Sequence, residues 1–306
     1  MKLMNFAAAA VTGILLSTTA VMAQDKPVVG LVMKSLANEF FQNMMVGAEE
    51  HVKARGDYEL IAVGMQNETD FEAQINAVDN FITRGVDAIV IAPADSRAMV
   101  RPVKRAIAAG IKVVNFDVAL DADAKAQQGL ELAFVGPDNR GGAKMAGDAL
   151  AQALGEGAKV VIIEGNPGAD NATERRLGFE DTVAEYKLDL LDSRTAHWET
   201  EEANQVFSTM LTAHPDIQGV MAANDSMAVG VVKALESAGR TDILVVGFDN
   251  IPAVGPMIAD GRMLATVDQF GTRMAADSID LALGIVAGGP DLEGWVKTEI
   301  QLVTAK

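Results

Sequence analysis

Short runs rich in Val and Ile alternate, from residue 28 onward, with longer segments whose apolar residues recur at helical spacing. Such runs are typical of parallel strands that are buried on both faces. The expected strands cover residues 28–33, 58–63, 88–92, 112–116 and 132–135, and then 160–164, 219–222, 244–248 and 264–267. The expected helices between them begin near Phe40, Asp70, Arg97 and Asp138. This βαβα order predicts an α/β protein with two doubly wound parallel sheets.

Glycines mark the ends of several expected helices, as C-terminal caps do. They are Gly56, Gly85, Gly110 and Gly239. No linker rich in Pro, Gly or Ser separates the two halves, so we expect short connections and a break near Pro137.

Length, cysteine count and charge narrow the class of protein. With 306 residues, the chain exceeds the roughly 100–200 residues of a usual domain. It has no cysteine, which excludes disulfides, thiolate chemistry and a lipid-modified N-terminal cysteine. The net charge of -17 opposes binding to nucleic acid or to anionic lipid. We expect a monomer that binds no nucleic acid.

The N-terminus resembles a cleavable signal peptide. Lys2 precedes an apolar stretch at residues 6–16, and Val21-Met22-Ala23 forms a small-residue cleavage pattern. A transmembrane anchor would need about 20 apolar residues, whereas this stretch soon reaches Ser17 and its polar neighbours. We therefore predict that residues 1–23 are a signal peptide and that the protein is secreted.

Polar and aromatic side chains gather directly after the expected strands. In open parallel sheets, ligands bind at the carboxyl ends of the strands. The residues at these ends are Lys34, Asn38, Phe40, Phe41, Asp95, Ser96 and Asp117 in the first half, and Arg175, Asn224, Asp225, Asp249, Asn250, Asp268 and Gln269 in the second. Carboxylates, amides and Arg can pair with several hydroxyl groups, and aromatic faces cover C–H surfaces, so this mixture suits a polyhydroxylated ligand.

Some of these residues have a simpler structural interpretation. Asp and Asn after a strand often cap the next helix, and we assign Asp138, Asp225 and Asn250 to that role. For Phe40 and Phe41, we expect one ring to point into the core and the other towards the cleft. Trp198 is interpreted either as a platform for the ligand or as part of a hydrophobic staple at a helix start.

Motifs of common enzyme classes are missing from the sequence. It has no GxGxxG after a strand, no GxxxxGK[ST], no HExxH and no GxSxG, and its three histidines lack ligand spacing. Asp117 and Asp249 remain a possible glycoside-hydrolase pair, but the sequence shows no environment that would raise one pKa above the other. We therefore expect no catalysis, no cofactor and no metal.

Six segments together resemble the ribose-type periplasmic sugar-binding proteins, whose fold is shared with the ligand domain of LacI-type repressors. The resemblance runs from Lys26 to the C-terminus. The segments are Ser35-Leu36-Ala37-Asn38-Glu39-Phe40-Phe41, Ile91-Ala92-Pro93-Ala94-Asp95-Ser96, Asp138-Asn139-Arg140-Gly141-Gly142, Glu174-Arg175 before Gly178-Phe179, Ala223-Asn224-Asp225-Ser226-Met227-Ala228 and Val246-Gly247-Phe248-Asp249.

The resemblance implies two similar lobes joined by three crossovers, near Pro137, Gln269 and Lys297. The first lobe would comprise residues 24–137 and 270–297, and the second 138–269 and 298–306. The resemblance also implies a ligand site in this chain. We add Lys34 to that site because it lies at the end of the first expected strand. The expected ligand-binding residues are Lys34, Asn38, Phe40, Phe41, Asp117, Asn139, Arg175, Trp198, Asn224, Asp249 and Gln269.

Four departures from ribose receptors bear on the ligand. Val118 replaces an Arg, Ala92 replaces an Asn, Lys34 replaces a small hydroxyl residue and Trp198 replaces a Phe. A lysine is a point charge and cannot reproduce the bidentate fork of a lost guanidinium. These changes point away from ribose and towards another monosaccharide or a sugar alcohol.

The function that follows is capture of a monosaccharide or polyol in a cleft that closes by hinge motion. The resemblance implies delivery to the inner-membrane permease of an ABC transporter, in the periplasm. The alternative is a sensory protein that presents a sugar or furanosyl signal to a chemoreceptor or a kinase ectodomain. A repressor would need a DNA-binding segment of about 50–60 residues before the first strand, and only the signal-like segment precedes it here.

Overall fold

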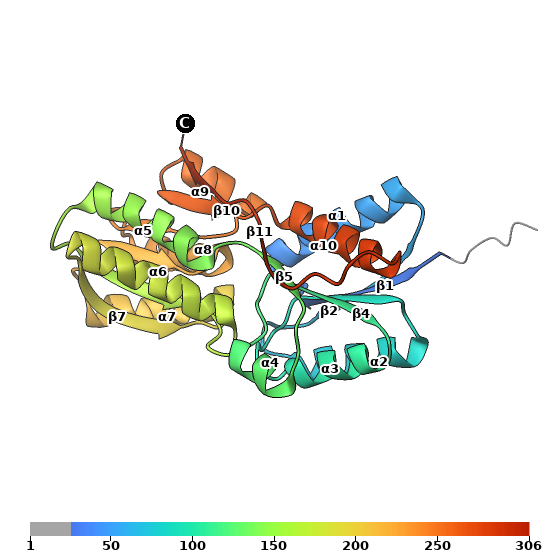
Figure 1. The fold of residues 1–306 in the computed structure, drawn as a ribbon. Coiled ribbons are helices and arrows are strands. Elements are labelled where there is room, and N and C mark those ends of the chain that lie inside the picture. Colours follow the sequence, from blue (N-terminus) through green and yellow to red (C-terminus); the bar gives the residue numbers. More distant parts are fainter. Residues whose placement is uncertain (1–25, 306) are drawn as a thin grey trace, which may run out of the picture.

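Two six-stranded sheets form the two lobes of the protein, whose computed structural model describes residues 26–305 (Figure 1). The first sheet has the order β11-β5-β4-β3-β1-β2, and all of its strand pairs are parallel. Its strands are β1 (Val28–Ser35), β2 (Glu59–Met65), β3 (Ala88–Ile91), β4 (Lys112–Phe116), β5 (Ala133–Gly136) and β11 (Gly294–Lys297). The helices of this lobe are α1 (Glu39–Arg55), α2 (Phe71–Arg84), α3 (Val100–Ala108), α4 (Ala122–Gln128) and α10 (Gly271–Val286).

The second sheet repeats this order as β12-β10-β9-β8-β6-β7. Its strands are β6 (Lys159–Glu164), β7 (Asp189–Thr195), β8 (Gly219–Ala222), β9 (Leu244–Val246), β10 (Ala265–Asp268) and β12 (Gln301–Thr304). The helices of this lobe are α5 (Asn139–Leu154), α6 (Asp170–Tyr186), α7 (Thr200–Ala213), α8 (Asp225–Ala238) and α9 (Gly255–Ala259), with a 3-10 turn at Pro252–Val254. Only β12 departs from the parallel pattern of the described strands, because it pairs antiparallel with β10.

Helices cover both faces of each sheet, which buries the Val- and Ile-rich strands. In the first lobe α1 and α10 pack together on one face, and α2, α3 and α4 lie on the other (Figure 1). In the second lobe α5 packs against α6, and α7 packs against α8. The fold class expected from the sequence is confirmed.

Three crossovers connect the lobes and form the hinge. The chain passes from the first sheet to the second between β5 and α5, returns between β10 and α10, and crosses again between β11 and β12. Each sheet contributes its edge and next-to-edge strands to these connections, so the hinge lies along one edge of both sheets. The crossovers run through the centre of Figure 1, between the two lobes.

Most expected elements are present, with small shifts at their ends. Helix α1 begins after Asn38, whose side chain accepts a hydrogen bond from the Phe40 amide, and ends at Gly56 in the left-handed conformation. The helix expected near Arg97 begins at Val100. Strand β7 was missed because its mixed sequence is only half-buried, and β11 and β12 were missed because they are short edge strands with exposed residues.

Residues 1–23, the expected signal peptide, lie outside the described residues. Within residues 26–305, no helix combines the length and the apolar character needed to cross a membrane.

Candidate functional site

The carboxyl ends of the two sheets face one another and enclose a small cavity. The space within it that a water-sized molecule can occupy is about 10 Å³ in this closed arrangement. Both lobes supply side chains to it, as expected for a ligand held at the ends of parallel strands. The lining residues are Lys34, Asn38, Phe40, Phe41, Glu68 and Asp117 from the first lobe, and Asn171, Arg175, Trp198, Asn224, Asp249 and Gln269 from the second lobe and its crossover.

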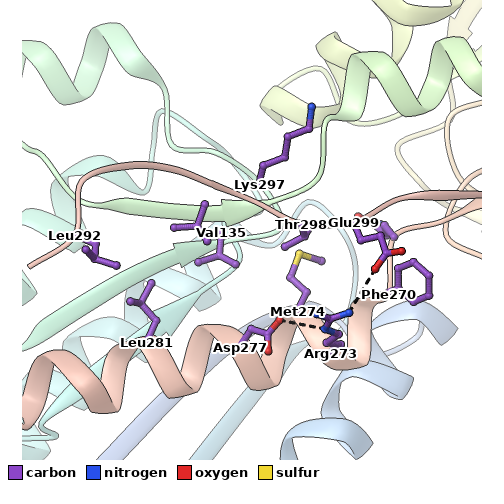
Figure 2. Close-up of a pocket in the computed structure, with 12 residues that line it drawn as sticks. Val135, Phe270, Arg273, Met274, Asp277, Leu281, Leu292, Lys297, Thr298 and Glu299 are labelled. Atoms are coloured by element: carbon purple, nitrogen blue, oxygen red, sulfur yellow. Dashed lines mark hydrogen bonds and ion pairs between the residues drawn. The ribbon is translucent and has the colours of Figure 1, made fainter.

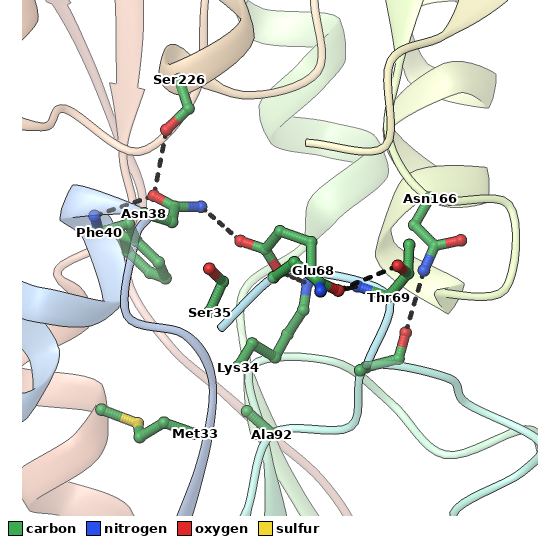
Figure 3. A network of polar contacts seen from close by, with 12 residues as sticks. Met33, Lys34, Ser35, Asn38, Phe40, Glu68, Thr69, Ala92, Asn166 and Ser226 are labelled. Atoms are coloured by element: carbon green, nitrogen blue, oxygen red, sulfur yellow. Dashed lines mark hydrogen bonds and ion pairs between the residues drawn. The ribbon is translucent and has the colours of Figure 1, made fainter. Parts of the chain in front are cut away.

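A buried ion pair forms the first-lobe wall. Lys34 Nζ, at the end of β1, lies 3.0 Å from Glu68 Oε2, and both side chains are almost fully buried. Asn38 Nδ2 donates a hydrogen bond of 2.7 Å to Glu68 Oε1, and Asn38 Oδ1 accepts one of 3.1 Å from Ser226 Oγ of the second lobe (Figure 3). This network holds the Glu68 carboxylate and links the lobes directly.

Arg175 organises the second-lobe wall from the first turns of α6. Its Nε donates to Asn139 Oδ1 at 2.9 Å, and its Nη1 donates to the Ala223 carbonyl at 2.9 Å and to Asp249 Oδ1 at 3.4 Å. The guanidinium also lies over the Phe248 ring, 3.6 Å from its centroid. Arg175 is therefore held in one orientation by partners on three different segments.

Asp117 and Asp249 occupy equivalent positions in the two lobes. Each follows a strand, β4 or β9, and each donates its backbone N–H to the carbonyl of a neighbouring strand, at 2.9 Å for Asp117 and 2.7 Å for Asp249. Both have positive φ angles, 62° and 117°. Backbone strain of this kind concentrates at functional sites, where the surrounding structure enforces it.

Burial changes the ionisation of the charged groups in the cavity. It raises the pKa of Asp249 to about 7, although Arg175 opposes the shift. It also raises the pKa of Asp117 and of Glu68, against the favourable charges of Lys34 and, for Asp117, Arg175. Burial lowers the pKa of Arg175 itself, against the pull of Asp249 and Asp117.

Aromatic rings cover the remaining surface of the cavity. Phe40 and Phe41 pack edge to face, with centroids 5.1 Å apart. Trp198 lies between the cations, 5.3 Å from Lys34 Nζ and 5.5 Å from Arg175 Cζ. Its indole also lies against Gly165, where an added Cβ would come within 2.1 Å of the ring. The tryptophan therefore fits only because residue 165 has no side chain.

Several buried polar atoms of the cavity have no hydrogen-bond partner in the described protein. Three are acceptors and one is a donor. They are Asp117 Oδ1, Asn171 Oδ1, Gln269 Oε1 and Trp198 Nε1. Because an unpaired buried polar group is costly, such atoms mark positions where a ligand would form hydrogen bonds.

Comparison with known proteins agrees with this architecture. A family model described as periplasmic binding protein domain matches residues 29–290. The chain is 46% identical to the D-ribose/D-allose-binding protein of Pseudomonas aeruginosa, over 92% of this chain and 90% of the relative. The chain belongs to the periplasmic binding protein family.

Solved structures resemble this periplasmic binding protein over nearly its whole length. An ABC transporter solute-binding protein from Burkholderia multivorans is 44% identical with a TM-score of 0.89, and the match covers 92% of this chain and all of that one (100%). A periplasmic solute-binding protein from Actinobacillus succinogenes, with bound D-allose, is 38% identical with a TM-score of 0.86, covering 91% and 98% of the two chains. The family is a class of sugar-binding proteins of ABC import systems.

Ten of the eleven residues expected to bind the ligand line the cavity of this periplasmic binding protein. The exception is Asn139, which lies behind Arg175 and holds its Nε. Phe40 and Phe41 differ from expectation in another way, since both rings line the cavity and both are buried. Trp198 also lines it, as the platform interpretation requires.

Two of the three residues assigned as helix caps have other roles. Asp138 does cap α5, by accepting from the Gly141 amide. Asp225 does not cap α8, because Asn224 has that role, and its buried carboxylate accepts from Thr266 Oγ1 at 2.8 Å and the Ile251 amide at 3.1 Å. Asn250 caps no helix and donates to Asp268 at 3.0 Å.

Two lining residues, Glu68 and Asn171, were not predicted from the sequence. Glu68 follows β2 and Asn171 follows β6, so the rule that placed the other residues at strand ends also covers these two. The sequence shows no environment that would raise the pKa of Asp117 above that of Asp249 or the reverse, and in the structure burial raises both. Asp249 contacts Arg175 and Gln269, at 3.4 and 2.7 Å, whereas Asp117 Oδ1 has no partner.

A second, larger cavity lies beside the hinge, between α10 and the segment after β11 (Figure 2). Its polar groups pair with one another, since Arg273 lies 3.5 Å from both Asp277 and Glu299. Apolar side chains such as Met274 and Leu281 form much of the rest. Two of its lining residues carry a buried atom without a hydrogen-bond partner among the described residues, Gln269 Oε1, which it shares with the interlobe cavity, and Thr298 Oγ1. Within the described residues, no cluster of three or more His, Cys, Asp or Glu is placed to hold a metal.

Proposed function

We propose that this protein captures a monosaccharide or a sugar alcohol in the interlobe cavity and delivers it to the permease of an ABC transporter. The observation that supports this most strongly is the excess of buried acceptor oxygens, on Asp117, Asn171 and Gln269. Hydroxyl groups can donate to all three, whereas a carboxylate or phosphate ligand has no such donors. A neutral ligand with several hydroxyls therefore fits the cavity best.

D-allose is the first candidate, and D-ribose is only the second because four residues of this chain depart from the pattern of ribose receptors. Both sugars occur in the name of the Pseudomonas aeruginosa relative, and D-allose is bound in the Actinobacillus succinogenes structure. The two share the same configuration at their corresponding hydroxyls, and allose has one more carbon. Lys34 and Glu68 add donor and acceptor atoms to one wall, which suits the additional hydroxyl of a hexose.

Binding and closure are coupled in the mechanism that we propose. The sugar first contacts one lobe, and the polar groups of the other lobe then reach its remaining hydroxyls as the hinge closes. Direct contacts such as Ser226 to Asn38, and the Glu68 amide to Glu199 Oε1 at 3.1 Å, accompany the closed arrangement. Closure is favoured to the extent that the sugar binds the closed form better than the open form.

The cellular setting and the lobe boundaries belong to the same proposal. Residues 1–23 would direct export to the periplasm and be removed there. The lobes would comprise residues 24–137 with 270–297, and 138–269 with 298–306. The protein would act as a monomer, without cofactor or metal.

The first test is a thermal-shift screen of the chain from Gln24 onward against pentoses, hexoses, sugar alcohols, amino acids and nucleosides. A ligand at 100 times its Kd adds about 2.7 kcal/mol to the free energy of unfolding. We expect shifts with D-allose and D-ribose. A response confined to amino acids or nucleosides would contradict the proposed ligand class.

The second test replaces Arg175, the best-anchored polar group of the cavity. Arg175→Lys keeps the charge but loses the fork that reaches Asn139, Ala223 and Asp249, so we expect Kd to rise by about 30-fold or more. Calorimetric titration with the sugar measures this. Ala153→Ser, on the exposed side of α5, is the control and should leave Kd unchanged.

A further inference from the structure

Two loops, one from each lobe, contact one another without lining the cavity. One follows β3 in the first lobe and includes Ala94 and Ser96, and the other joins β6 to α6 in the second lobe and includes Asn166 and Gly168. The loops approach so closely that an added Cβ on Gly168 would lie 2.6 Å from Asp95 Oδ2. We call this contact the clasp.

Three hydrogen bonds cross between the lobes at the clasp. The Ser96 amide donates to the Gly168 carbonyl at 2.9 Å, and Ser96 Oγ accepts from the Asp170 amide at 2.9 Å. Asn166 Nδ2 donates to the Ala94 carbonyl at 3.3 Å, a contact seen in Figure 3. Ser96 is itself 5% exposed, so its two bonds are shielded from water.

The hydrogen bond from the Asp170 amide to Ser96 Oγ is made at the N-terminus of a helix, because Asp170 is the first residue of α6. The first N–H groups of a helix have no partner within the helix. The residue at the N-cap position is Ala169, which offers no side-chain acceptor. The hydroxyl that accepts from the start of α6 therefore comes from the opposite lobe.

Helix α6 also carries Asn171 and Arg175 into the cavity. The clasp therefore stabilises the closed arrangement at the helix that holds a large part of the second-lobe wall. Burial raises the pKa of Asp170 to about 6, with Glu174 and the first-lobe Asp121 acting in the same direction, which agrees with a water-poor contact.

We propose that Ser96 caps helix α6 across the cleft and so determines how tightly the protein holds its sugar without contacting it. Ser96 is a positioning residue: its bonds form on closure, whichever sugar lies in the cavity. The effect on binding rests on the proposed function, whereas the effect on closure does not.

The test compares Ser96→Ala with the wild-type chain in stopped-flow and calorimetric titrations with D-allose and D-ribose. We expect Kd to rise about fivefold for both sugars through faster dissociation, because a lost cap weakens only the closed form. The ratio of the two Kd values should stay unchanged. Ser96→Thr, which keeps a hydroxyl acceptor, should restore the wild-type Kd.

A matched control is Ser208→Ala, which removes an exposed hydroxyl that donates to Asn204 within α7. It should change neither Kd nor dissociation rate. An unchanged Kd in Ser96→Ala, an equal loss in Ser208→Ala, or a changed allose-to-ribose ratio would each overturn the proposal.

Small-angle scattering of the sugar-free protein separates this proposal from the proposed function. The Ser96→Ala variant should have a larger radius of gyration than the wild type, since its closed form is less favoured. If no sugar binds the wild type, the proposed function fails, and the scattering comparison still decides the role of Ser96. Equal radii would count against the clasp.

Discussion

The pKa values of the cavity carboxylates are determined mainly by the free-energy cost of removing the charged groups from water. Asp249 contacts a guanidinium and accepts from Gln269, yet burial still raises its pKa to about 7. Opposite charge does not compensate fully for desolvation at a site this enclosed. Asp249 should therefore titrate near neutral pH, where exposed carboxylates do not.

The raised pKa of Asp249 predicts how the stability of the protein depends on pH. Between the ordinary pKa of 3.8 and about 7, folded Asp249 holds a proton that the unfolded chain has released. The free energy of unfolding should therefore fall as pH rises through this window. Asp117 and Glu68, whose pKa values are also raised by burial, act in the same direction.

Thermal unfolding of the sugar-free protein from about pH 4 to 8 measures the effect. Asp249→Asn, which cannot titrate, should flatten the profile. Sugar affinity should show the opposite trend and rise with pH, because an ionised Asp249 accepts hydroxyl bonds better than a protonated one. A stability that rises steadily across this range would contradict the assignment.

At the scale of elements, glycine lets helices α5 and α6 pack closely. A Cβ added to Gly178, on α6, would lie 2.3 Å from the Arg140 carbonyl of α5. That neighbour is backbone and cannot rotate away. The α6 helix that carries Arg175 is therefore positioned against α5 by the absence of a side chain at residue 178.

Gly178→Ala should lower the free energy of unfolding by about 2 kcal/mol or more, since the helices must separate. Gly284, in α10, is the matched control because a Cβ there meets nothing within 4 Å. Gly284→Ala should raise stability by about 0.5–1 kcal/mol through helix propensity alone. Chemical denaturation of both variants measures this, and equal effects would show that helix spacing is not the cause.

At the scale of the whole molecule, a strongly acidic surface encloses a cavity suited to a neutral ligand. The net charge is -17. A charged ligand would be attracted or repelled by this field, and added salt would screen the interaction. A sugar has no charge on which the field can act.

We therefore expect Kd for the sugar to change less than about twofold between about 0.05 and 1 M NaCl. Calorimetric titration across this range measures it. A steep dependence on salt would instead indicate a charged ligand, and with it a different class of solute.

The sequence by itself determined the two α/β lobes and the general position of the cavity. Val- and Ile-rich runs specify buried parallel strands, and polar residues after such runs must converge at the carboxyl edge of a sheet. Lys34, Asp117 and Asp249 were found in this way, and resemblance to a family added residues such as Asn139. Edge strands with exposed residues carry no such pattern, so β11 and β12 were not predicted.

The tertiary structure alone decided which side chain contacts which partner. It placed Asn139 behind Arg175, turned Asp225 into a buried acceptor, and brought Ser96 to the start of a helix in the opposite lobe. Each of these contacts joins residues far apart in the chain, and the contact of Ser96 depends in addition on the closed arrangement of the two lobes. Local periodicity reports which face of an element is buried but not what lies against it, so these partners could not be predicted from the sequence.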